Sequence, residues 1–218
     1  MSTPSKQRII HALVDRHGRT YADEAGISIR DTPAPPFQLL VLSLLLSARI
    51  SAATAMGGFG GLVDAGWTTP TKLAASTWEQ RTKTLNESGY ARYDESTARM
   101  LGDTVDLLLD RYDGDLRQLR DHADHDPDAE RRLLQQFSGI GEVGAAIFSR
   151  EVQIVWDEMY PFADRRALAA ADRIGLGGSV PDLTRNTDGA AHFALVVAAL
   201  VRCDLAGDHA DIMATAGR

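Results

Sequence analysis

Apolar residues recur along most of the chain at the three- and four-residue spacing of amphipathic helices, and the alternation typical of strands is almost missing. Ser, Thr, Asp or Pro stand where several of these segments begin, as expected of helix caps. Loops are predicted at 21–35, 125–128, 159–163 and 175–187, and the last of these is rich in Gly, Ser, Pro and Asp. The pattern predicts an all-α protein with helices at 4–17, 36–49, 51–65, 70–75, 77–88, 94–112, 116–122, 128–137, 142–156, 164–174, 189–204 and 208–216.

Composition narrows the classes of function. With 218 residues, 44% of them hydrophobic, the chain can bury a core without disulfides or metals to hold it. The net charge of −7 argues against a strongly basic nucleic-acid coat but allows a local basic face. Among the 23 basic residues only Lys6, Lys72 and Lys83 are lysines, which limits the side chains that can serve as an amine nucleophile.

Cys203 is the only cysteine, so the chain can form neither an intrachain disulfide nor a four-cysteine zinc or iron–sulfur site. A reducing cytoplasm is the expected location. The spacing of His122 and His125 is compatible with a metal, but their acidic surroundings favour a solvated loop, and we predict no bound metal. The most apolar run, FQLLVLSLLLSA, has twelve residues and predicts a buried helix. No signal peptide is expected, and no stretch is expected to reach the length and hydropathy of a membrane span.

The stretch FSGIGEVGAA spells G-x-G-x-x-G with Gly139, Gly141 and Gly144, the pattern of a dinucleotide-binding loop. That loop requires a preceding strand, whereas DAERRLLQQFSG has the apolar spacing of a helix, so a nucleotide cofactor is disfavoured. A helix, a tight glycine turn and a second helix remain, and the free N–H groups of such a turn bind phosphate oxygen. The alternative is an ordinary turn between two helices with a glycine cap.

The segment LLQQFSGIGEVGAAIF resembles the helix-hairpin-helix of the base-excision DNA glycosylases typified by endonuclease III. Three further segments are similar to parts of that family in the same order: PFQLLVLSLLLSARIS at 36–51, LNESGYARYDESTARML at 85–101 and PFADRRALAAADRIGL at 161–176. The resemblance implies a two-lobed helix-hairpin-helix fold with a cleft between the lobes. It places a helical barrel at 35–157, with the hairpin at 128–156, and a second lobe formed by 1–34 and 158–218.

The resemblance also assigns residues to base excision, in which the base leaves the stack and the glycosidic bond breaks through an oxocarbenium-like state. Asp164, in PFADRR, corresponds to the family's aspartate, which stabilises the developing positive charge and orients water. The alternative is that Asp164 only caps the helix after it, and both roles are compatible. Tyr90, Tyr93 and Tyr160 lie in predicted loops and are candidates for the base pocket.

DNA contacts are expected first from the backbone of the hairpin, where N–H groups bind phosphate without a net positive charge. Arg49 stands where the family places a residue that fills the gap left by the flipped nucleotide, with a solvated arginine as the alternative. Arg165 and Arg166 either hold phosphates or pair with the chain's carboxylates. The candidate DNA-binding residues are Gly139, Ile140, Gly141, Val143, Gly144, Arg49, Arg165 and Arg166.

Three differences from members of the family bear on the expected activity and cofactor. Its bifunctional members carry a lysine at the position of Val143, so the resemblance implies a monofunctional glycosylase that uses water. The family's four-cysteine cluster cannot form from Cys203 alone. The adenine glycosylase branch of the family uses a glutamate in the first barrel helix to protonate its leaving base, whereas residues 36–49 contain no carboxylate. The resemblance therefore favours alkylated purines that carry their own positive charge, with oxidised pyrimidines or mismatched bases as alternatives if an acid comes from elsewhere in the fold.

We therefore expect a monomer without cofactor or membrane association whose partner is double-stranded DNA containing a damaged base. A non-catalytic DNA-binding or damage-sensing relative is the main alternative. A lyase that uses Lys83 is the third.

Overall fold

A computed structural model describes residues 4–218, and within that range the chain is helical and contains no strand. The all-α prediction is therefore confirmed. The helices are α1 (Lys6–His17), α2 (Tyr21–Glu24), α3 (Ala34–Ser47), α4 (Ala52–Asp64), α5 (Pro70–Ala74), α6 (Trp78–Glu87), α7 (Asp94–Tyr112), α8 (Gln118–His122), α9 (Pro127–Leu134), α10 (Glu142–Val152), the 3₁₀ turn η1 (Asp157–Met159), α11 (Arg165–Arg173), α12 (Val180–Thr184), α13 (Gly189–Ala206) and α14 (His209–Ala216).

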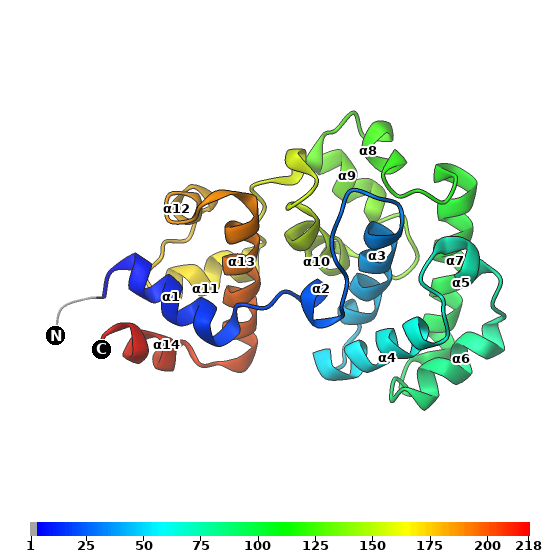
Figure 1. The fold of residues 1–218 in the computed structure, drawn as a ribbon, viewed down its shortest axis with the longest axis horizontal. Helices are drawn as coiled ribbons and strands as arrows, with labels where there is room; N and C mark the ends of the chain where they lie inside the picture. Colours follow the sequence, from blue (N-terminus) through cyan, green and yellow to red (C-terminus); the bar gives the residue numbers. More distant parts are fainter. Residues whose placement is uncertain (1–3) are drawn as a thin grey trace.

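The helices gather in two lobes (Figure 1). We call α2–α10 the barrel lobe and α1 with α11–α14 the terminal lobe. The buried apolar residues form two matching clusters, one between Tyr21 and Met159 and one that joins the α1 residues 9–13 to residues 163–216. The two ends of the chain thus fold together. The boundaries at 35 and 157 stay a prediction, and the clusters place Tyr21, Ala22 and Ile27 with the barrel lobe.

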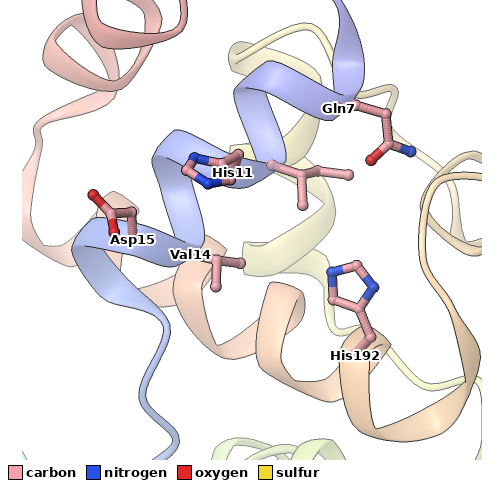
Figure 2. A pocket seen from close by; sticks show the side chains of 6 residues that line it. Gln7, His11, Val14, Asp15 and His192 are labelled. Atoms are coloured by element: carbon pink, nitrogen blue, oxygen red, sulfur yellow. The ribbon is translucent and has the colours of Figure 1, made fainter.

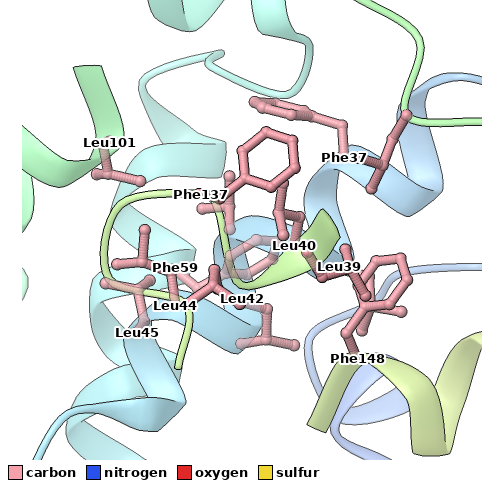
Figure 3. Packing of buried hydrophobic residues seen from close by; sticks show 14 of the residues in the cluster. Phe37, Leu39, Leu40, Leu42, Leu44, Leu45, Phe59, Leu101, Phe137 and Phe148 are labelled. Atoms are coloured by element: carbon pink, nitrogen blue, oxygen red, sulfur yellow. The ribbon is translucent and has the colours of Figure 1, made fainter. Parts of the chain in front are cut away.

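The centre of the barrel lobe is α3, whose sequence APPFQLLVLSLLLS is apolar on every side. A helix of that composition is stable only when protein surrounds it. Phe37, Leu40 and Leu45 are fully buried, and α3 packs against α4 and α10 (Figure 3). This packing fixes the position of α10, the second helix of the hairpin.

The corresponding helix of the terminal lobe is α13, which packs on α1 and α11. Its 18 residues have a mean hydropathy of 1.6, so by length and composition alone it could cross a membrane. Half of it is buried inside the protein, including Phe193, Val197 and Leu200. The expectation that no stretch reaches this length and hydropathy was wrong, and packing in the core of the lobe accounts for the composition.

Two short helices lie where loops were predicted. Thr20 accepts a hydrogen bond from the Asp23 amide at 3.1 Å and caps α2, while Ser179 accepts one from the Asp182 amide at 3.3 Å and caps α12. In both cases a Ser or Thr precedes an Asp by three residues, which is the signature of a capped helix start. Four or five residues are too few to show a hydrophobic period, so the cap was the only available signal.

Glu151 of α10 joins the N-terminal segment to the barrel lobe. Its carboxylate is 4% exposed and accepts hydrogen bonds from the backbone amides of Tyr21 at 2.7 Å and Ala22 at 2.6 Å. These are first-turn amides of α2, which have no partner inside the helix. Burial raises the pKa of Glu151, and the two amide hydrogen bonds oppose that rise.

Candidate functional site

The hairpin turn between α9 and α10 depends on two glycines with different roles. Gly139 has a φ of +81°, a left-handed conformation that favours glycine, and an added Cβ would lie 2.7 Å from Met100 Sδ. Gly141 is the N-cap of α10 with a φ of −91°, and an added Cβ there would meet no atom within 4 Å. Gly139 therefore sets the conformation of the turn, and Gly141 leaves open space at the start of α10.

The start of α10 presents free backbone amides. No side chain caps this helix, and Gly141, Glu142 and Val143 are exposed, with Val143 at 62%. The first amides of a helix lack partners inside it and carry the positive end of the helix dipole. An exposed, uncapped start of this kind binds anions such as phosphate.

Ile140 and Gly144 are buried residues of the G-x-G-x-x-G segment, and both pack inside the barrel lobe rather than face solvent. The Ile140 amide donates to the Phe137 carbonyl at 3.0 Å, and its side chain is 3% exposed in the core of the barrel lobe. The expectation that this amide is available to phosphate is therefore not supported. Gly144 is also buried, and a Cβ on it would lie 3.6 Å from Ser47 Cβ, so it permits α10 to approach the end of α3 closely.

The loop after α3 lies beside the hairpin. The Ser47 hydroxyl donates to the Leu44 carbonyl at 2.8 Å and to the Gly139 carbonyl at 3.2 Å, which links the two segments directly. Arg49, two residues further on, is exposed and forms no ion pair with any residue in the range 4–218. The loop that carries this cation is therefore tied to the hairpin turn.

Asp164 caps α11, as the alternative interpretation predicted. Its Oδ1 accepts a hydrogen bond from the Ala167 amide at 2.9 Å, and its Oδ2 is paired with the guanidinium of Arg150. The Asp164 side chain is 16% exposed and the Arg150 side chain 8%. Sequence reasoning missed Arg150, because no local pattern relates it to a carboxylate fourteen positions away.

The ion pair lies at the far end of α10 from the hairpin turn. Arg150 follows Glu142 by eight residues, which corresponds to about 12 Å along the helix axis. The hairpin amides and the candidate catalytic carboxylate are thus attached to opposite ends of one rigid helix. The fold relates the two sites but does not place them in contact.

Two cavities lie elsewhere in the terminal lobe and between the lobes. The first, of about 410 Å³, is lined by α1 residues and by His192 of α13 (Figure 2). The second, of about 250 Å³, lies between α13 and the barrel lobe, where Ala194 and Leu195 face Ile29, Glu151 and Ile154. Asp164 lines neither of them.

The three candidate tyrosines lie in different environments. Tyr90 is 1% exposed and accepts a hydrogen bond from the Thr97 hydroxyl at 3.2 Å; burial raises the pKa of its phenol. Tyr93 precedes α7, with the Arg92 guanidinium 5.2 Å from its ring centre. Tyr160 packs edge-on against Phe193 with ring centres 5.5 Å apart. The expectation for Tyr90 was wrong, since the core of the barrel lobe encloses the ring.

The two arginines after Asp164 also differ. Arg166 pairs with Asp204 at 3.2 Å, which agrees with the alternative of an ion pair inside the protein. Arg165 is exposed and has no ion-pair partner within the described part of the chain. Of the two, Arg165 is the one whose charge is available to a ligand.

None of the three lysines adjoins the hairpin in a described contact. Lys83 pairs with Glu87 at 3.8 Å on α6, and Lys6 donates to the Leu176 carbonyl at 2.9 Å. Figure 1 shows α11 in the terminal lobe and α6 on the side of the barrel lobe that faces away from the terminal lobe. A lysine that forms a Schiff base must reach the sugar beside Asp164, so this separation disfavours that role for Lys83.

The residues present do not fit the four-thiolate iron–sulfur cluster that the family resemblance implies. Cys203, fully buried in α13, is the sole thiol of the sequence. A [4Fe–4S] cluster is held by four thiolates, and the side chains around Cys203 offer nitrogen and oxygen atoms instead.

No family model matches this sequence, and no curated protein matches it. Two solved structures resemble the chain: a trapped endonuclease III–DNA covalent intermediate in an estranged-adenine complex, with a TM-score of 0.52, and a non-covalent endonuclease III–DNA complex, with a TM-score of 0.53. In each comparison the identity is 19%, over 91% of this chain and 85% of the other. At that identity the likeness concerns the fold, and the chain has the all-α fold of endonuclease III.

Proposed function

We propose that this protein binds double-stranded DNA through its glycine hairpin and acts as a monofunctional DNA glycosylase. The observation that carries the proposal is the exposed, uncapped start of α10 behind the left-handed Gly139, in a fold shared with endonuclease III–DNA complexes. Backbone amides bind phosphate without net positive charge, which suits a chain whose charge is −7.

Unpaired arginines support binding near the hairpin and near Asp164. Arg49 lies in the loop that Ser47 ties to the Gly139 carbonyl, and Arg165 begins α11. Each cation that meets a phosphate releases counterions and adds to affinity. We propose that these two side chains, together with the exposed amides of Gly141, Glu142 and Val143, contact the sugar-phosphate backbone.

For the chemical step we propose that Asp164 stabilises the positively charged sugar and that water attacks it. The Ala167 amide and Arg150 hold the carboxylate in one orientation. Arg150 also offsets part of its charge, so the stabilisation is weaker than from a free carboxylate. A leaving base that already carries positive charge needs the least assistance, which favours alkylated purines.

The position of Val143 carries the proposal that strand cleavage is absent. Its side chain is aliphatic and 62% exposed at the start of α10, where the bifunctional members of the resembled family carry lysine. Without an amine there, no Schiff base forms at the sugar. We likewise propose that the protein holds no iron–sulfur cluster, since one cysteine supplies one thiolate.

A non-catalytic damage sensor is the second candidate, and the Arg150–Asp164 pair favours it. Both side chains are largely buried and satisfy each other, and Asp164 lines neither cavity described above. In a sensor this pair would serve only to hold α11 against α10.

Base release separates the two candidates. Duplexes with one alkylated, oxidised, deaminated or mismatched base are incubated with wild type and with Asp164→Asn, then treated with alkali to cleave abasic sites. Release by wild type and not by the variant supports the glycosylase. Binding of damaged DNA without release from any duplex favours the sensor, and a covalent complex trapped by borohydride contradicts the monofunctional assignment.

DNA binding is tested independently with Gly141→Val, because a Cβ added at this position meets no atom within 4 Å. Loss of one hydrogen bond to a charged phosphate is worth about 1.5 kcal/mol, so we expect affinity to fall at least about tenfold. Gly60→Val on α4 is the matched control, because Gly60 also has no atom within 4 Å of an added Cβ. If the two variants bind DNA with equal affinity, the hairpin does not contact DNA.

A further inference from the structure

A group of side chains in the terminal lobe has the composition of a metal site. His17 ends α1, Cys203 lies in the last two turns of α13, and Asp208 precedes α14. One ligand atom from each of the three lies within 4.8 Å of the other two. Although the sequence led us to expect no bound metal, we propose that His17, Cys203 and Asp208 bind a divalent transition-metal ion of the zinc type.

The ligand atoms suit that class of ion. Zinc takes thiolate sulfur at about 2.3 Å and imidazole nitrogen at about 2.0 Å, so two such ligands in a tetrahedral site lie about 3.5 Å apart. His17 Nε2 and Asp208 Oδ2 are 2.8 Å apart, and the remaining separations need to close by little more than 1 Å at most, about the reach of a side-chain rotation. A water molecule completes four ligands.

Charge balance favours a divalent ion over a monovalent one. A thiolate and a carboxylate together carry two negative charges, His17 coordinates as a neutral imidazole, and a divalent cation neutralises the set. Arg16 Nε lies 2.7 Å from Asp208 Oδ2 and would hold the carboxylate in place while it binds the metal. Such a partner orients a ligating carboxylate.

The orientation of Asp208 is independent support. Although it occupies the N-cap position of α14, its side chain makes no capping hydrogen bond to that helix. Both of its oxygens face His17 Nε2 instead, at 3.0 Å and 2.8 Å. Asp208 is 11% exposed and His17 15%, while Cys203 is fully buried, so an ion enters from the His17 and Asp208 side.

The consequence of binding is mechanical. The three ligands come from the first helix, the central helix and the last helix of the terminal lobe, so one ion joins the two ends of the chain. This site is separate from the hairpin and from Asp164, and its test does not depend on the proposed DNA chemistry.

The experiment is a cobalt titration of the full chain after treatment with a chelator. Co²⁺ bound to a thiolate gives a charge-transfer band in the near ultraviolet and d–d bands in the visible. We expect both to appear in wild type and to saturate at one equivalent, and Zn²⁺ to bleach them and to raise Tm. Cys203→Ser should lose the charge-transfer band and the rise in Tm.

If Cys203→Ser does not fold, variants of the two partly exposed ligands, His17 and Asp208, still test the proposal. His17→Gln and Asp208→Asn, each checked by circular dichroism, should bind Co²⁺ at least about tenfold more weakly. His11→Gln, at an exposed position of the same helix, is the matched control and should bind as wild type does. Folded wild type that binds neither ion, or unchanged affinity in both ligand variants, would overturn the proposal.

Discussion

Wild type is expected to lose stability as pH rises, and the substitution Glu130→Gln is expected to abolish that loss. Glu130 lies in α9, the first helix of the hairpin, and is fully buried. Neither of its carboxyl oxygens has a hydrogen-bond partner within the described part of the chain. Burial, followed by the nearby carboxylate of Glu158, raises the pKa of Glu130 from 4.5 to about 8.

The direction of the effect follows from proton binding. Between pH 4.5 and about 8 the folded chain keeps the Glu130 proton and the unfolded chain has lost it, so the free energy of unfolding falls as pH rises. The stabilisation is complete below 4.5 and lost above about 8, an interval worth on the order of 5 kcal/mol. That is a large part of the stability of an ordinary domain.

Glu158 acts in the opposite direction at lower pH. Burial opposes its ionisation, but the hydrogen bond from Arg120 lowers the pKa of Glu158 from 4.5 to about 2. Its contribution is therefore present above 4.5 and lost as pH falls toward 2. Glu130 and Glu158 together therefore predict that the stability of the protein is greatest near pH 4.5.

The assay is urea unfolding of wild type and Glu130→Gln from pH 4.5 to 8.5. Glutamine is uncharged and has nearly the same shape as the protonated acid, so the two proteins should be similar at the acidic end. At the alkaline end the variant should be more stable by several kcal/mol. Asp128→Asn, exposed on the same helix, is the control and should run parallel to wild type. A difference between Glu130→Gln and wild type that does not change with pH would refute the reasoning.

Three further predictions concern the hairpin and its supports. Gly139→Ala should lower the unfolding free energy by about 1–3 kcal/mol, measured by thermal melting, because its φ is +81° and Met100 Sδ is 2.7 Å from the added Cβ; an unchanged Tm would contradict this. Glu151→Ala should cost about 1–3 kcal/mol or more in urea unfolding, since it leaves the amides of Tyr21 and Ala22 without acceptors. Arg49→Ala and Arg165→Ala should each reduce the slope of log affinity for DNA against log salt by about 1, and a slope equal to that of wild type would exclude the phosphate contact.

Sequence periodicity located the long helices because their buried faces repeat over several turns. The prediction of a helix at 94–112 agrees with α7, and the helices at 189–204 and 208–216 differ from α13 and α14 by one or two residues at their ends. The predicted helix at 142–156 ends instead at Val152, and the 3₁₀ turn η1 follows. Trp156 is apolar and fully buried without being helical, and a pattern of burial cannot distinguish those two states.

The candidate site was only partly accessible to sequence reasoning. The glycine spacing identified the hairpin because positive φ and close approach demand glycine locally. The environment of Asp164 was not accessible in the same way, since its pairing with Arg150 depends on how α11 packs against α10. Tyr90 shows the same limit, because a tyrosine in an expected loop turned out to lie under α4 and α7 in the core of the barrel lobe.

The arrangement of charge along α10 separates binding from chemistry in the proposed function. Its first turn has exposed, uncapped amides, while its last turn carries Arg150, which pairs with Asp164. The two ends are about 12 Å apart, beyond the distance at which substitutions usually influence each other. Gly141→Val should therefore change DNA affinity and Asp164→Asn should change base release, and the double variant should show both effects without further loss. Strong coupling between them would mean that bound DNA reorganises α10, and the ion pair would then belong to the binding step.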